Sequence, residues 1–186
     1  MGGMKSFILI LCLLIAGCAP VSVVEPTGGN RARVRFVTNT EGITVLRAYE
    51  GENCSGEEQE WVRMRNGYLL TGSEKRLGIP LWSYNVNAAK ELYVNTDKAM
   101  HGMFFGSESV GNYVVSCAVP FTFSFLPDHD YEVSYKFFIS TCLVEVSEIE
   151  GNSQGGFRAR QLSVFDNKLD ERDASCKKHF RQGRRS

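Results

Sequence analysis

The sequence lacks an excess of charge of either sign. Its 186 residues include 21 Lys and Arg against 21 Asp and Glu, so the formal net charge is zero. Proteins that bind nucleic acid usually present a strongly basic surface, and the balance of charges gives this chain no overall field of that kind. We therefore expect no nucleic-acid partner.

Histidine and the common catalytic motifs are also scarce. The three histidines are His101, His129 and His179, whereas acid–base catalysis needs titratable groups held within reach of one another. The sequence has no His-Glu-x-x-His, no phosphate-binding glycine loop and no Gly-x-Ser-x-Gly. We predict that the protein is not an enzyme, with no catalytic residues and no cofactor; an envelope enzyme is the less favoured alternative.

Metal-binding patterns are weak. No Cys-x-x-Cys is present, and the spacing of the cysteines matches no zinc ribbon. Asp128-His129-Asp130 offers oxygen and imidazole ligands at close spacing, but the further acidic positions of a calcium-binding loop are missing. We interpret this tripeptide as a hydrophilic turn and predict no metal site.

Long hydrophobic runs are absent except for one near the start. Lys5 precedes an uninterrupted apolar run from Phe7 to Ala16, which ends at small residues. This run is too short for a membrane-spanning helix, which needs about 20 apolar residues. A positive residue, an apolar stretch and a small-residue end are typical of a secretory signal peptide. We assign residues 1–17 to the signal peptide.

The end of this segment, Ile15-Ala16-Gly17-Cys18, resembles the lipobox of bacterial lipoproteins. The resemblance implies cleavage before Cys18 and lipidation of its thiol. Because Ala19 is not aspartate, it also implies the outer membrane, and we expect the periplasmic face. A plain cleaved signal peptide and an uncleaved anchor are the alternatives. Each buried methylene of an acyl chain contributes about 0.8 kcal/mol, so two or three chains hold durably.

Four cysteines remain after Cys12 in the signal peptide and Cys18 at the anchor. An even number in an exported protein predicts disulfides, because the bacterial envelope keeps thiols oxidised. We favour pairing Cys117 with Cys142, on adjacent strands of one meander, and Cys54 with Cys176, which would tie down the tail. The other two connectivities stay open.

The rest of the sequence favours strands. It has 12 Phe, 7 Tyr and 18 Gly and no long block of helix-forming residues. Short alternating runs separated by turn residues predict an all-β fold, an antiparallel β-sandwich of short strands over residues 31–150. We expect strands at 31–36, 43–49, 61–65, 91–95, 103–105, 113–125, 131–138 and 142–149.

Two local arrangements can be predicted in more detail. The run from Arg31 to Phe36 places arginine at every second position, which indicates a solvated strand face or, less favoured, a site for an anionic ligand. The turn at 39–42 suggests that this strand forms a hairpin with 43–49. Short connections suggest that residues 113–149 form an antiparallel meander. Tyr131 is placed to hydrogen-bond across its turn, as in a tyrosine corner.

Both ends of the domain differ in composition. Residues 18–30 contain two prolines and two glycines and fit a tether between lipid and domain. Residues 151–186 form a C-terminal extension, in which 151–156 is a glycine-rich link and 157–165 a weakly alternating candidate strand. The charged tail beyond it is expected to be flexible and soluble; contact with anionic lipid is the alternative, through Lys177, Lys178, Arg181, Arg184 and Arg185.

The lipobox, the later cysteines, the run from Leu126 to Val133 and the strand from Cys142 to Glu148 together resemble small proteobacterial outer-membrane lipoproteins with a single β-rich domain. This resemblance implies a location and a fold and carries no catalytic residue. We predict a lipid-anchored, non-enzymatic binding or structural module whose partner is an envelope protein or a wall polymer. The alternative is an accessory lipoprotein of a secretion apparatus, similar to the β-sandwich lipoprotein of type VI systems.

Overall fold

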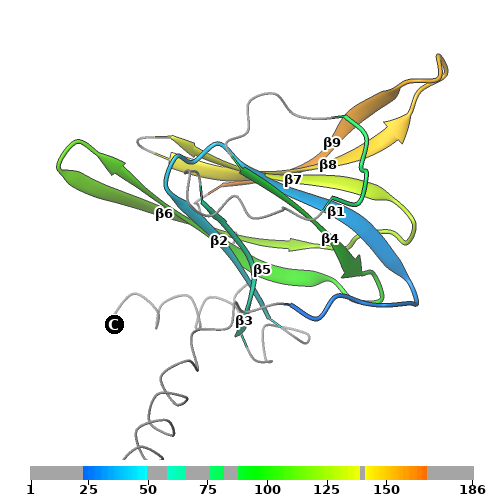
Figure 1. Cartoon of the computed structure of the whole chain (residues 1–186), viewed down its shortest axis with the longest axis horizontal. Coiled ribbons are helices and arrows are strands. Elements are labelled where there is room, and N and C mark those ends of the chain that lie inside the picture. Colours follow the sequence, from blue (N-terminus) through cyan, green and yellow to red (C-terminus); the bar gives the residue numbers. More distant parts are fainter. Residues whose placement is uncertain (1–22, 50–57, 66–75, 82–87, 139–140, 167–186) are drawn as a thin grey trace, which may run out of the picture.

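A computed structural model describes residues 23–49, 58–65, 76–81, 88–138 and 141–166 of the chain. These residues form strands and no helix, and the strands make two sheets packed face to face (Figure 1). The predicted β-sandwich is therefore confirmed. The strands are β1 (Arg31–Thr38), β2 (Ile43–Tyr49), β3 (Glu58–Arg65), β4 (Ala88–Asn95), β5 (Met100–Val110), β6 (Tyr113–Phe123), β7 (Asp130–Phe138), β8 (Thr141–Gly151) and β9 (Phe157–Asp166).

One sheet has five strands in the order β4-β1-β7-β8-β9, and the other has four in the order β3-β2-β5-β6. All neighbouring strands are antiparallel except β1 and β7, which run parallel. A parallel pair needs a long connection, and here the whole four-stranded sheet is built between β1 and β7 in the sequence.

The core lies between the sheets and follows the alternation of the strands. Buried apolar residues recur at every second position of β1, β7 and β8, as period-two side-chain geometry requires. Across the core, the ring of Phe104 on β5 of the four-stranded sheet stacks on the ring of Tyr135 on β7, with 5.6 Å between the ring centroids. The shared core includes Ala32, Val34, Phe36, Tyr131, Val133, Tyr135, Phe137, Cys142, Val144 and Val146.

The predicted hairpin between the first two strands is wrong. β1 pairs with β4 on one side and β7 on the other, so no edge of β1 is left for β2, which lies in the opposite sheet. The chain crosses between the sheets at 39–42. There the hydroxyl of Thr38 lies 2.9 Å from the hydroxyls of Thr40 and Thr44, and all three side chains are buried. This small polar cluster satisfies hydroxyl groups that the core would otherwise leave without partners.

The predicted meander is only partly right. β7 and β8 pair as expected, and β9 continues the run, but β6 pairs with β5 in the other sheet. The turn after β6 therefore changes sheets. The hydroxyl of Tyr131 accepts a hydrogen bond of 3.1 Å from the backbone N–H of Leu126 across this turn. The corner that the sequence suggested for Tyr131 is thus present, and it marks the change of sheet.

β9 extends the five-stranded sheet beyond residue 150, where the predicted domain ends. The glycine-rich segment before β9 is an ordered hairpin turn. The side-chain oxygen of Asn152 accepts hydrogen bonds from the N–H groups of Gln154 and Gly156, at 3.0 and 2.8 Å. An asparagine that bonds the backbone two residues ahead is a common turn device, so the turn returns the chain to pair with β8.

The prediction of a solvated outer face on β1 is only partly right, since the side chain of Arg33 is 38% exposed but Arg35 is buried. Arg35 is only 1% exposed, and its guanidinium group contacts Glu91 at 3.1 Å and Glu132 at 3.2 Å. The backbone carbonyls of residues 79–81 also accept hydrogen bonds from it. Arg33 pairs with Asp130 at 2.6 Å. These arginines are therefore engaged within the chain, which leaves the anionic-ligand alternative without support.

Candidate functional site

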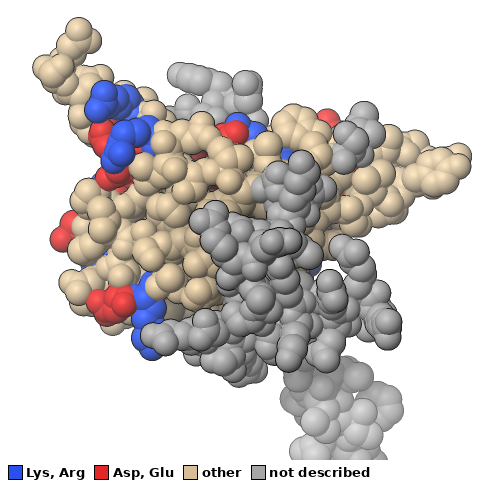
Figure 2. Space-filling view, turned by 180° about the vertical axis from the view of Figure 1, so that it is seen from behind, with Lys and Arg blue, Asp and Glu red and all other residues tan. Residues whose placement is uncertain are grey.

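The hairpin of β5 and β6, here called the β5–β6 arm, extends past the body of the sandwich. Figure 1 shows it in green at the left, and Figure 2 shows its tip projecting at the right. Val110 and Tyr113 are opposite each other at the tip, joined by Gly111 and Asn112. Gly111 has a φ of 61°, which suits glycine at the first central position of a tight hairpin turn. Local sequence thus makes the arm a continuous two-stranded ribbon.

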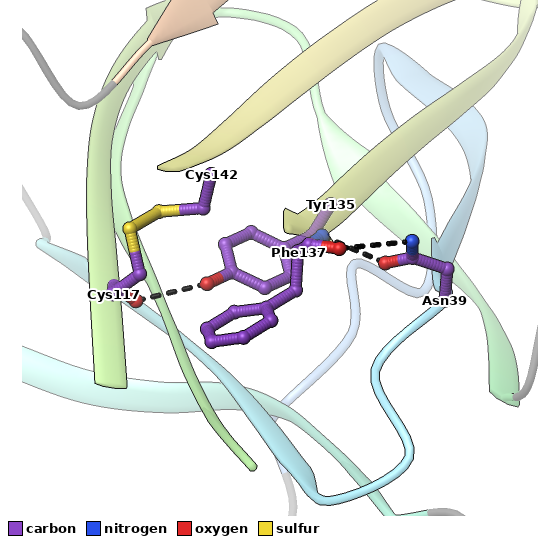
Figure 3. Close-up of a disulfide and its surroundings, with 5 residues drawn as sticks. All are labelled: Asn39, Cys117, Tyr135, Phe137 and Cys142. Carbon is purple, nitrogen blue, oxygen red and sulfur yellow. Dashed lines mark hydrogen bonds between the residues drawn. A yellow bond between two sulfur atoms is a disulfide. The ribbon is translucent and has the colours of Figure 1, made fainter. Parts of the chain in front are cut away.

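A disulfide fixes the base of the arm. Cys117 of β6 is bonded to Cys142 of β8, with the Cα atoms 6.1 Å apart (Figure 3). This is the pairing that the sequence favoured. However, the two cysteines lie in different sheets, so the bond links the sheets rather than neighbouring strands of a meander. The arm is consequently attached covalently to the five-stranded sheet at the point where it leaves the core.

Tyr135 of β7 also holds the base of the arm, at Cys117. Its hydroxyl donates a hydrogen bond of 2.9 Å to the carbonyl oxygen of Cys117, as Figure 3 shows. The ring occupies the space beside Gly106 on β5, where an added Cβ would lie 2.4 Å from the tyrosine oxygen. Burial raises the pKa of the Tyr135 hydroxyl, because ionisation would place a charge in the core. Glycine at 106 is therefore required by the close approach of the ring.

Asn39 fixes the end of β7 next to this group. Its side-chain oxygen accepts a hydrogen bond of 2.7 Å from the N–H of Phe137, and its amide nitrogen donates one of 3.2 Å to the carbonyl of the same residue (Figure 3). The amide side chain thus acts as one more strand partner for β7. The base of the arm is held by Tyr135 of β7 and Cys142 of β8, and Asn39 supports it indirectly by fixing the end of β7.

β6 is an edge strand that differs from the other edges of the sandwich. None of its 11 residues is charged, and no other described strand pairs with its outer side. Natural proteins usually protect an exposed edge with charged side chains, because free backbone N–H and C=O groups invite pairing with another chain. The three other edge strands carry charged side chains, among them Glu60, Arg63 and Arg65 on β3, Lys90 on β4, and Arg158 and Arg160 on β9.

The arm also exposes apolar side chains, most of them near its tip. Tyr113 is 78% exposed and Val114 is 71% exposed, while Val110 and Phe105 are each 40% exposed. Single exposed apolar residues are common on protein surfaces. Here they are grouped on one ribbon beside an uncharged strand edge. This combination suits the addition of an extended strand from another chain, with backbone hydrogen bonds along the edge and apolar contacts on both faces.

A second group of polar residues lines a cleft of about 330 Å³ at the start of β7 and the end of β8. His129 Nδ1 contacts the carboxylate of Glu148, which also binds Arg160. Arg160, together with Arg158, holds the pKa of Glu150 below its usual range. The two glutamates of the cleft are thus held in ion pairs with His129, Arg158 and Arg160. Asp128 lies in the turn that the sequence predicted, with a φ of 62°.

Several predicted site residues lie outside the described residues, namely Cys18, Cys54, Cys176 and the basic residues of the tail. Among the residues that the structure describes, no three His, Cys, Asp or Glu side chains gather as a metal site requires. In the same part of the chain, no helix has the length and apolar character needed to cross a membrane.

The sequence predicted a strand at 113–125, but it did not identify this strand as an uncharged edge of a sheet. The available signals were the absence of charge from Tyr113 to Phe123 and the proline at 120, a residue that sheets accept mainly in edge strands.

In comparisons with known proteins, no family model, curated protein or solved structure matches the chain.

Proposed function

We propose that this chain is a lipid-anchored protein of the bacterial outer membrane, on its periplasmic face, that binds an envelope protein through the outer edge of β6. It acts as a binding module without catalysis. The uncharged edge of β6 is the observation that carries the proposal, because each of the other described edge strands carries charged residues that discourage pairing.

The lipobox and the structure support complementary parts of this proposal. Lipidation at Cys18 supplies the membrane anchor, and residues 19–30 supply a tether. An oxidising envelope compartment fits the disulfide at the base of the arm. A protein partner is favoured over a wall polymer because a strand edge offers a row of backbone donors and acceptors, which another polypeptide strand matches in spacing.

The experiment places a charge on the edge without disturbing the core. Val114→Lys adds a lysine at a position that is already 71% exposed, and Ser109→Lys adds the same charge at the residue paired with Val114, on the inner strand of the arm. Membranes from cells producing each variant are treated with a chemical cross-linker. We expect Val114→Lys to lose the cross-linked complexes of the wild-type chain and Ser109→Lys to keep them. Equal complexes in all three proteins would contradict the proposal.

A further inference from the structure

We infer that the strand added to β6 is β6 of a second copy of this chain, which makes the protein a two-fold symmetric dimer. This inference rests on the proposed function and names the partner of the same edge. Two antiparallel β6 strands would join the four-stranded sheets of both copies into one continuous sheet.

Charge is the first reason to choose a second copy. In a two-fold symmetric pair the same surface meets itself, so a charged edge strand would carry its charged side chains into the interface between the copies, which discourages strand pairing. β3, β4 and β9 all carry charged residues. Among the described edges, β6 alone would meet its own copy without placing a charged residue in the interface, because it has none.

The side-chain pattern of β6 is the second reason. Pro120 has no N–H, so the pairable stretch of the edge runs from Tyr113 to Val119, with Ser116 at its centre. Antiparallel pairing about Ser116 places Tyr113 opposite Val119 of the second copy. The same register places Val114 opposite Ala118 and Val115 opposite Cys117.

The side chains of these pairs fit together in size on both faces of the sheet. Val119 is buried on the core side, and Cys117 on the same side is bonded to β8. Since alternate residues share a face, Tyr113 and Val115 lie on this side too. The ring of Tyr113, 78% exposed in the single chain, would thus cover the side of the second copy's core next to Val119. The other face carries small residues, so no bulky groups oppose each other there.

The register gives a sharp test in the full-length chain. At the two-fold axis the two Ser116 Cα atoms would lie about 4.5–5.5 Å apart, within the range that a disulfide spans. Ser116→Cys is oxidised in isolated membranes and compared with Ser109→Cys on non-reducing gels. Both positions are exposed and share one face of the arm, but only residue 116 is on the edge strand.

We expect Ser116→Cys to give a reducible species of twice the chain mass and Ser109→Cys to stay at the single mass. A second measurement uses the purified chain in detergent, where sedimentation equilibrium should find two copies for wild type and one for Val114→Lys. The inference is overturned if Ser116→Cys stays single or if the wild-type chain is monomeric. If the dimer is absent but Val114→Lys still loses cross-linked complexes with other proteins in membranes, only the dimer inference fails and the proposed function stands. If Val114→Lys keeps every cross-linked complex of the wild-type chain, the dimer inference and the proposed function both fail.

Discussion

The hydroxyl of Tyr135 donates a hydrogen bond of 2.9 Å to the carbonyl oxygen of Cys117, and so joins β7 of one sheet to β6 of the other. The same cysteine is bonded covalently to Cys142 on β8. One residue of the edge strand is therefore held by two strands of the opposite sheet. This arrangement keeps the base of the arm fixed while its outer edge stays accessible.

Replacing Tyr135 by phenylalanine tests the hydrogen bond. The ring would keep its stacking on Phe104, but the carbonyl of Cys117 would lose the hydroxyl partner. A net hydrogen bond of this kind contributes about 1 kcal/mol, so we expect Tyr135→Phe to lower the free energy of unfolding by about that amount in urea titrations. An unchanged midpoint at equal slope would show that the bond does not stabilise the fold.

High pH should destabilise the protein through the same residue. Burial raises the pKa of Tyr135 in the folded state, whereas an unfolded tyrosine ionises near its ordinary pKa of about 10. The contribution of a group with a raised pKa is complete below its unfolded pKa and is lost as pH rises above it. We expect the unfolding free energy of the wild-type chain to fall above about pH 10. Tyr135→Phe should show a smaller fall, and identical pH profiles would contradict this explanation.

Gly106→Ala tests the close approach at the base of the arm. The added Cβ would lie 2.4 Å from the oxygen of Tyr135 and 2.5 Å from a ring carbon, so a buried ring would have to move. Overpacking of this kind typically costs about 1–3 kcal/mol, measurable in thermal or urea unfolding. Gly151→Ala is the matched control on β8, since an added Cβ meets nothing within 4 Å there. Equal effects of both variants would rule out the steric explanation.

The buried ion pairs of Arg35 should contribute more to the free energy of unfolding than an exposed ion pair does. Arg35 and Glu91 are 1% and 2% exposed, so Arg35→Met would remove the buried charge partner of this carboxylate and leave it only the more distant, part-exposed Arg76 at 3.9 Å. Breaking such a pair costs about 3–5 kcal/mol. Arg63→Met breaks the exposed pair with Glu60, which we expect to cost less than about 1 kcal/mol. Chemical denaturation of the two variants should show this order, and the reverse order would contradict the assigned burial.

The regular alternation of β7 and β8 could be predicted from sequence because it is a local property. Every second residue from Tyr131 to Phe137 faces the core, and the period alone identifies the strand and its inner face. The corner at Tyr131 was predictable for a similar reason, since its partner Leu126 is only five residues away. Such features need no knowledge of which strands are neighbours.

Strand neighbours depend on the whole chain and were predicted less well. Arg35 looked solvated in sequence because its partners Glu91 and Glu132 are 56 and 97 residues away. The turn at 39–42 has the length of a hairpin turn, and only the pairing of β1 with β4 and β7 shows that the chain must change sheets there. The exposed edge of β6 is likewise a consequence of strand order, which local patterns do not encode.

The proposed location of the arm at the membrane, and of the cysteines in an oxidising compartment, depends on export and on lipidation at Cys18. Intact mass spectrometry of the chain purified from membranes tests both events most directly. We expect the mass of residues 18–186 plus acyl chains, increased on reduction by about four hydrogens for two disulfides. A chain that retains residues 1–17, or that lacks acyl mass on Cys18, would contradict the account.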